Sequence, residues 1–142
     1  MSVPDELRRD VVVNASRQRV WQVLTEPDQL AMWFPTRSAE MDLRPGGAAR
    51  FSWEDSTDEA IIDVVAHLER LVFRWRPEGL DRPYTTVSIT LTDAAEGGTH
   101  VVLVESGFAS LPAQIYEQSY EGNDKGWAVE LAELKAYLEA AA

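Results

Sequence analysis

The sequence predicts an α+β domain in which a curved antiparallel sheet wraps around one long C-terminal helix. Apolar and polar residues alternate with a period of two through much of residues 40–106, as they do in half-buried strands. Turn residues separate these runs at hairpin spacing. An amphipathic stripe follows over residues 127–138, so one long helix is available to cover the buried face of the sheet.

The chain begins with a predicted strand and two short helices. Residues 11–13 are all valine, and β-branched side chains fit the pleated surface of a strand. Ser16 is a favourable N-cap for a helix whose apolar face lies within residues 20–24. Pro27 suits the first turn of a second short helix, which has its apolar side within residues 30–34.

Six apolar runs predict the other strands of the sheet. They are residues 40–44, 50–54, 60–68, 71–75, 85–91 and 99–106. In the third run, Ile62 and Val64 are expected to share the buried face, because alternate residues of a strand point the same way. Asp55, Asp58 and Glu59 lack the spacing of a calcium loop and are expected to form a solvated turn.

The last predicted element is a long helix. Trp127, Leu131, Leu134 and Leu138 are spaced at i, i+4, i+7 and i+11, so they lie on one helical face. No internal repeat or linker divides the chain. We therefore expect a single domain over residues 1–142.

The composition excludes several classes of function. With 24 acidic and 13 basic residues, the formal net charge is −11, so nucleic acid and anionic membrane surfaces would be repelled. The absence of cysteine excludes disulfides, thiolate nucleophiles and iron–sulfur clusters. No apolar run approaches the roughly 20 residues that span a bilayer, and residues 1–10 lack the apolar segment of a secretory signal. We expect a cytoplasmic protein without membrane insertion.

No metal site and no cofactor are expected. The histidines, His67 and His100, belong to no HExxH motif and to no cluster of possible ligands. We interpret both as exposed residues or as residues with satisfied hydrogen bonds near strand ends. The sequence also lacks a Walker loop, a GxGxxG motif and a GxSxG motif.

A further pattern is the order of aromatic, proline, glycine and leucine positions along residues 11–138. These positions are Val20-Trp21, Thr25-Glu26-Pro27, Leu30, Trp33, Pro45-Gly46-Gly47, Gly126-Trp127, Leu131 and Leu134. In this order and spacing they resemble the SRPBCC (START/Bet v-like) superfamily. Within that superfamily, the resemblance is to the branch named for the activator of heat shock protein 90 ATPase.

The resemblance implies a helix-grip (START-like) fold with a cavity between the curved sheet and the long helix. Relatives use this cavity for lipids, sterols, polyketides or other apolar compounds, and some, such as aromatase/cyclases, are enzymes. The eukaryotic namesake stimulates a chaperone and has an additional N-terminal domain. We expect no room for such a domain in a chain of 142 residues.

Glu105 is the single, weak candidate for acid–base catalysis. It continues the face that includes Leu103 in the last predicted strand. A carboxyl group that points into an apolar cavity can serve as an acid, a base or a ligand anchor. The structural alternative is that Glu105 reaches solvent near the strand end or pairs with Arg74 or Arg76. Leu103 and Glu105 both belong to the predicted ligand-binding set.

Aromatic residues complete the predicted ligand-binding set. Trp53, Phe73 and Trp75 lie on middle strands, where their rings are expected to line the cavity. Tyr116 and Tyr120 are four residues apart, so in a helix they share a face and their hydroxyl groups can anchor a ligand. The alternative for these side chains is ordinary core packing, because apolar periodicity indicates burial of any kind.

Three functions are compatible with these observations. The favoured prediction is binding, without catalysis, of a small hydrophobic or aromatic molecule such as a lipid or polyketide. The first alternative is a cyclase, dehydratase or hydrolase that uses Glu105. The second is an interaction protein similar to the chaperone ATPase activator, with an acidic surface for a basic protein partner. Monomer and homodimer remain open, because an exposed edge strand can pair two copies.

Overall fold

The computed structural model describes residues 4–34 and 38–140 of the 142-residue chain. Its helices are α1 (Arg17–Thr25), α2 (Pro27–Leu30) and α3 (Ala113–Ala140), with 3₁₀ turns at Ala95–Gly97 and Phe108–Ser110. Its strands are β1 (Glu6–Val13), β2 (Ser38–Met41), β3 (Ala48–Ser52), β4 (Thr57–Ala66), β5 (Arg70–Pro77), β6 (Thr85–Asp93) and β7 (Thr99–Ser106).

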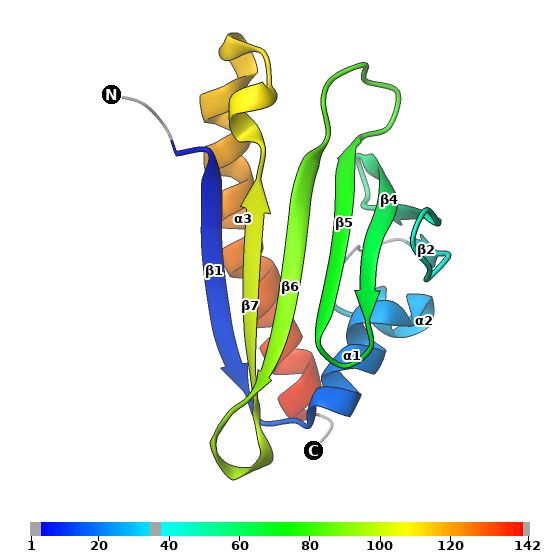
Figure 1. Ribbon diagram of the computed structural model, residues 1–142, viewed down its shortest axis with the longest axis vertical. Helices are drawn as coiled ribbons and strands as arrows, with labels where there is room; N and C mark the ends of the chain where they lie inside the picture. The colour runs from blue at the N-terminus through cyan, green and yellow to red at the C-terminus, as the bar shows by residue number, and fades with distance from the viewer. Residues whose placement is uncertain (1–3, 35–37, 141–142) are drawn as a thin grey trace.

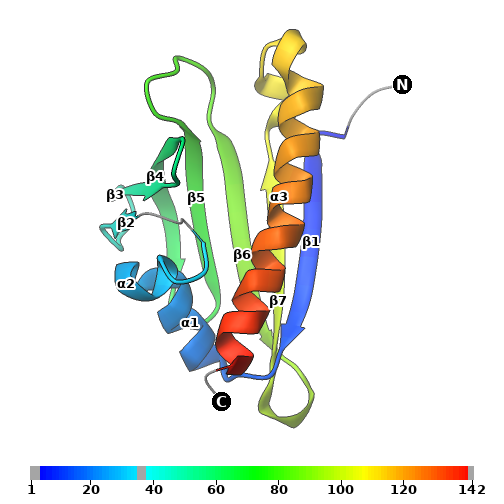
Figure 2. The ribbon, with the colours of Figure 1, turned by 180° about the vertical axis from the view of Figure 1, so that it is seen from behind.

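The strands of the described residues form a seven-stranded antiparallel sheet in the order β1-β7-β6-β5-β4-β3-β2 (Figure 1). β1 comes first in the chain but pairs with β7, while consecutive hairpins build the rest of the sheet. Figure 2 shows α3, α1 and α2 in front of the same face of the sheet. The predicted curved sheet with a long C-terminal helix is therefore confirmed.

The first helix begins at its predicted cap. The Ser16 hydroxyl accepts a hydrogen bond from the backbone N–H of Arg19 at 3.2 Å, which satisfies one of the free donors at the start of α1. Trp33, which lies beyond the end of α2, donates its indole N–H to the carbonyl of Val23 at 3.0 Å. This bond attaches the segment after α2 to α1, next to the aromatic core.

The core lies between α3 and the inner face of the sheet. The predicted stripe of α3 is buried, since Trp127, Leu131, Leu134 and Leu138 are all at most 4% exposed. An ion pair fixes the helix against the edge strand, because the guanidinium of Arg9 in β1 donates to both carboxylate oxygens of Asp124 at 2.8 and 3.1 Å.

A β-bulge in β4 changes which of its residues face inward. The register shifts between Ile62 and Val64, so Ile62 is 0% exposed whereas Val64 is 38% exposed. The prediction that these residues share the buried face is wrong, because a bulge adds one residue to one strand and reverses the alternation beyond it. The strand also ends at Ala66, and Leu68 lies in the following turn with a φ of 66°.

The prediction of a solvated loop at Asp58 and Glu59 is also wrong, because both residues lie in β4. Glu59 is the cross-strand neighbour of Arg76 in β5, and its carboxylate accepts a hydrogen bond from Nε of Arg76 at 2.9 Å. This cross-strand pair extends the strand beyond its apolar run. Asp58, the preceding residue, consequently faces the interior side of the sheet.

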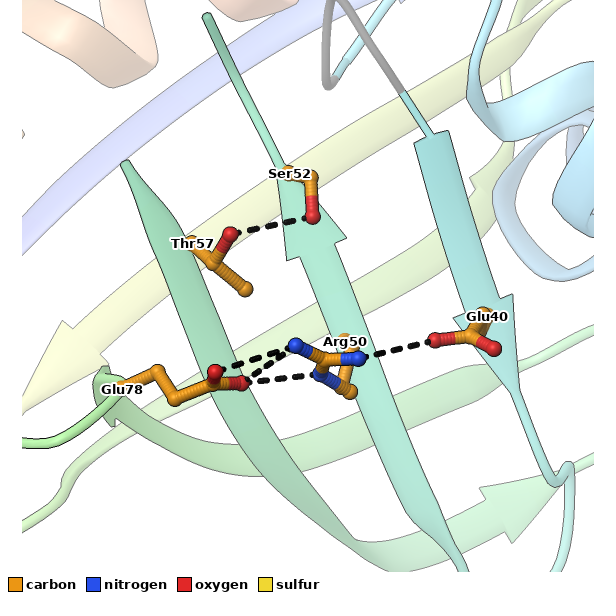
Figure 3. A network of polar contacts seen from close by, with 5 residues as sticks. All are labelled: Glu40, Arg50, Ser52, Thr57 and Glu78. Carbon is orange, nitrogen blue, oxygen red and sulfur yellow. Dashed lines mark hydrogen bonds and ion pairs between the residues drawn. The ribbon is translucent and has the colours of Figure 1, made fainter. Parts of the chain in front are cut away.

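A polar network links the short strands at the other edge of the sheet (Figure 3). Arg50 of β3 donates to both carboxylate oxygens of Glu78 at 2.8 and 3.0 Å, and to Glu40 of β2 at 3.5 Å. The hydroxyls of Ser52 and Thr57 lie 3.1 Å apart across β3 and β4. Exposed ion pairs contribute little free energy, but these contacts hold in register the strands that flank Trp53.

Candidate ligand-binding pocket

A pocket of about 280 Å³ lies between the sheet and α3. Residues of β4, β5 and β6 form one wall, residues of α3 form the wall opposite, and the loop between β5 and β6 contributes a third side. The lining residues Ser56, Pro83 and Gly122 are exposed, so the pocket opens to solvent there. Its volume lies near the lower end of the range for small-molecule sites.

Four aromatic side chains form the apolar wall of this pocket. The rings of Phe34 and Trp127 are almost parallel, with centroids 5.2 Å apart and an interplanar angle of 9°. Trp127 stacks in turn against Trp75 at 5.4 Å, and Trp53 meets Phe34 edge-on at 5.2 Å. All four line the pocket, so a ligand would meet extended ring surfaces that favour stacked or edge-on contact with other rings.

Glu105 of β7 is 0% exposed and lies directly behind this wall. Its Oε2 accepts hydrogen bonds from the indole N–H of Trp75 at 2.8 Å and from the hydroxyl of Thr85 at 2.6 Å. Its Oε1 accepts from the indole N–H of Trp127 at 2.8 Å, and Asn123 donates to both oxygens at 3.1 and 3.0 Å. All partners donate, so the arrangement complements an ionised carboxylate.

This arrangement makes Glu105 a positioning residue for the pocket wall. Trp75, Thr85, Asn123 and Trp127 all line the pocket, whereas Glu105 is not among its lining residues. The expected alternative of an ion pair with Arg74 or Arg76 is wrong, because those guanidiniums bind Asp63 and Glu59 instead. The buried carboxylate thus holds two indole rings, one from the sheet and one from α3, in a fixed orientation.

Two carboxyl groups with altered titration line the same pocket. Burial raises the pKa of Asp58 to about 6. The positive charge of Arg82 lowers this pKa in part, and the negative charge of Glu105 raises it further. Burial also raises the pKa of Glu130 to about 7, and the neighbouring charge of Glu133 adds to that rise. Carboxyls in this range exchange protons near neutral pH.

The raised pKa values of Asp58 and Glu130 predict a loss of stability with rising pH. Folding favours their protonated forms, so their stabilising contribution is complete below the usual values of 3.8 and 4.5 and is lost as pH rises through about 6 and about 7. Asp58→Asn combined with Glu130→Gln should remove this loss. Urea unfolding of both proteins from about pH 5 to pH 8 tests this, because contributions from other groups cancel in the difference. Parallel curves would contradict the prediction.

Sequence reasoning missed the polar residues that line the pocket, among them Asp58, Arg82 and Glu130. Asp58 could have been found from its alternation with buried Ala60, and Glu130 from its place three residues after Trp127 on the same helical face. Arg82 lies in the loop between β5 and β6, where no periodicity indicates which way a side chain points.

Two glycines leave space on the α3 side of the pocket. Gly122 and Gly126 are four residues apart, so they lie on one helical face, and both line the pocket. A Cβ atom at either position would meet no heavy atom within 4 Å. Neither glycine is needed to avoid a backbone clash, and their effect is to widen the pocket.

The predicted ligand-binding residues lie at different depths. Trp53 and Trp75 line the pocket. Phe73 and Leu103 are buried in the core at 2% and 0% exposure, and Phe73 packs edge-on against Trp75. Ligand contact by these four side chains stays a prediction.

The predicted tyrosines lie in the first turns of α3 and do not themselves line the pocket. Tyr116 and Tyr120 are half-buried against the core, and Tyr120 packs edge-on against Phe108 at 5.3 Å. Phe108 itself lines the pocket. Anchoring of a ligand by the two hydroxyls stays a prediction.

The described residues include no group of three or more histidine and acidic side chains that could hold a metal ion. His67 lies in the turn after β4 with its ring edge-on to Trp21 at 5.8 Å, and the ring of His100 lies 2.7 Å from a carboxylate oxygen of Asp10. Among the described helices, none is long and apolar enough to cross a membrane.

A curved antiparallel sheet that grips one long helix, with a pocket between the two, defines a helix-grip protein of the SRPBCC type. More narrowly, the chain belongs to the family of Activator of Hsp90 ATPase homolog 1-like proteins, whose family model matches residues 14–139. The resemblance inferred from the sequence is thereby confirmed. A search of the curated proteins finds no match.

Solved structures of several proteins are similar to this chain. DynU16, a putative protein in the dynemicin biosynthetic locus, is 28% identical with a TM-score of 0.81 over 98% of this chain and 49% of its own. MLL2253 from Mesorhizobium loti is 18% identical, with a TM-score of 0.84 over 96% and 98% of the two chains. The Aha1 dimer from Colwellia psychrerythraea is 19% identical, with a TM-score of 0.78 over 94% and 96%. The last two show the shared fold, and our chain spans about half the length of DynU16.

Proposed function

We propose that this protein binds a small, ring-containing apolar molecule in the pocket between the sheet and α3. The observation that supports this most directly is the aromatic wall of Phe34, Trp53, Trp75 and Trp127 beside a space of about 280 Å³. A wall held rigid before the ligand arrives loses little entropy on binding. The hydrogen bonds that Glu105 accepts from two of the four rings, Trp75 and Trp127, supply that rigidity.

The similarity to DynU16 supports the same proposal. That protein is described as belonging to a biosynthetic locus, which fits a role in handling a small organic molecule. We do not propose catalysis by Glu105, because its oxygens are bound to four donors behind the pocket wall. A reacting group must come within hydrogen-bond distance of the substrate.

Titration with acetonaphthone, a neutral two-ring ketone, tests the proposal. Calorimetry should show saturable binding to one site, accompanied by a change in tryptophan fluorescence. Trp53→Ala should weaken binding about fivefold or more, since one aromatic contact is worth about 1 kcal/mol. Trp21→Phe is the matched control, because Trp21 packs against His67 outside the pocket. Absence of saturable binding, or equal weakening by both substitutions, would contradict the proposal.

A further inference from the structure

Two buried polar atoms on the pocket's lining residues have no hydrogen-bond partner within the described chain. They are Nε of Arg82 and Oε2 of Glu130. Buried polar atoms without partners are rare in folded proteins, because each one costs free energy that a hydrogen bond would restore. Thr85 and Asn123 of the lining are already bound to Glu105. A ligand that offers one acceptor and one donor would satisfy both of the remaining atoms.

The two atoms lie on different walls of the pocket. Arg82 belongs to the loop between β5 and β6, which lies at the same end of the sheet as the start of α3 (Figure 2). Glu130 lies on α3, which forms the opposite wall. Because the two atoms belong to different walls, we place the acceptor and the donor in separate groups on the ligand.

The charges around the pocket favour a neutral ligand. Asp58 and Glu130 line it together with Arg76 and Arg82, but Arg76 is already bound to Glu59. The carboxylate of Glu105 lies directly behind the wall, so acidic groups are in excess and an anion would be repelled. A cationic ligand would find carboxyl groups but would leave Nε of Arg82 without an acceptor.

We propose that the ligand is a neutral aromatic compound with a hydroxyl that donates to Oε2 of Glu130 and a carbonyl oxygen that accepts from Nε of Arg82. The ring system occupies the space beside the aromatic wall and the two α3 glycines, and the polar groups extend to either side of it. This inference rests on the proposed function, which requires only that an apolar ring enters the pocket.

A matched set of naphthalene compounds tests the inference. Hydroxyacetonaphthones have both groups, with the hydroxyl on the same ring as the acetyl group or on the other ring. Acetonaphthone lacks the hydroxyl, naphthol lacks the carbonyl, and ethylnaphthalene lacks both. At about pH 8, where Glu130 is ionised, at least one hydroxyacetonaphthone should bind the wild-type protein about tenfold more tightly than either singly substituted compound.

Variants assign each ligand group to its residue. In the Arg82→Met variant, the carbonyl group of the ligand should no longer increase affinity, while the hydroxyl group still should. In the Glu130→Met variant, the hydroxyl should no longer increase affinity, while the carbonyl still should. Both substitutions keep an apolar stem and remove a polar atom that has no partner, so both variants should fold. Urea unfolding of each variant verifies this.

The outcomes separate this inference from the proposed function. If all the naphthalene compounds bind with equal affinity, the inference is overturned and the proposed function stands. If none binds saturably, both are overturned. Tighter binding by hydroxynaphthoic acid than by the hydroxyacetonaphthones would overturn the requirement for a neutral ligand. If each variant lost the affinity gained from both the carbonyl and the hydroxyl group, the assignment of these groups to Arg82 and Glu130 would be overturned.

Discussion

Replacing Glu105 with alanine is expected to lower the free energy of unfolding by about 3–5 kcal/mol, the cost of removing one partner from a buried charged network. The substitution would leave the indole N–H groups of Trp75 and Trp127, the Thr85 hydroxyl and the Asn123 amide without their acceptor. The acceptor that these four groups share is 0% exposed, so the substitution removes it from the interior of the folded chain.

Glu105→Gln distinguishes the lost acceptors from the lost volume. Glutamine fills the same space and keeps one acceptor oxygen, but its amide group faces donors and should repel them. We expect Glu105→Gln to lower the free energy of unfolding, but by less than Glu105→Ala does. Urea unfolding measures both variants, with Glu121→Ala as the control, because Glu121 is exposed on α3 and such changes usually stay within about 0.5 kcal/mol. If Glu105→Ala matched Glu121→Ala, the buried network would have no structural role.

Sequence periodicity predicted the elements whose residues repeat regularly. The alternation in β6 and β7 and the leucine stripe of α3 are uninterrupted, so their buried faces agree with the prediction. Periodicity failed in β4 at two points. The bulge after Ile62 inserts a residue that no local pattern shows. The first residues of that strand extend beyond its apolar run through the cross-strand pair of Glu59 with Arg76.

The candidate site was less predictable because its contacts join distant segments. Glu105 was identified from its place on an apolar strand face, but its partners belong to β5, β6 and α3 and meet only in the folded chain. A single sequence shows which residues share a face of one element. It does not show that a carboxylate there will bind two indoles rather than face the cavity.

Gly126→Leu is expected to weaken ligand binding by about tenfold to a hundredfold, because inserting a large side chain into occupied space costs about 1–3 kcal/mol. Glycine in a helix interior is itself unfavourable by about 1 kcal/mol relative to alanine. A Cβ at Gly126 meets nothing within 4 Å, so packing does not explain the glycine, and we attribute it to the space that it leaves in the pocket.

The stability of the same variants tests this explanation. Gly126→Ala should raise the free energy of unfolding by up to about 1 kcal/mol, with little change in affinity for acetonaphthone. Gly126→Leu should fold at least as stably as the wild type but bind weakly, which separates pocket space from fold integrity. Ala132→Leu adds the larger side chain at an exposed position of α3 outside the pocket and should leave affinity unchanged. Equal affinities of the Gly126→Leu and Ala132→Leu variants would mean that the ligand binds elsewhere, whatever the aromatic wall suggests.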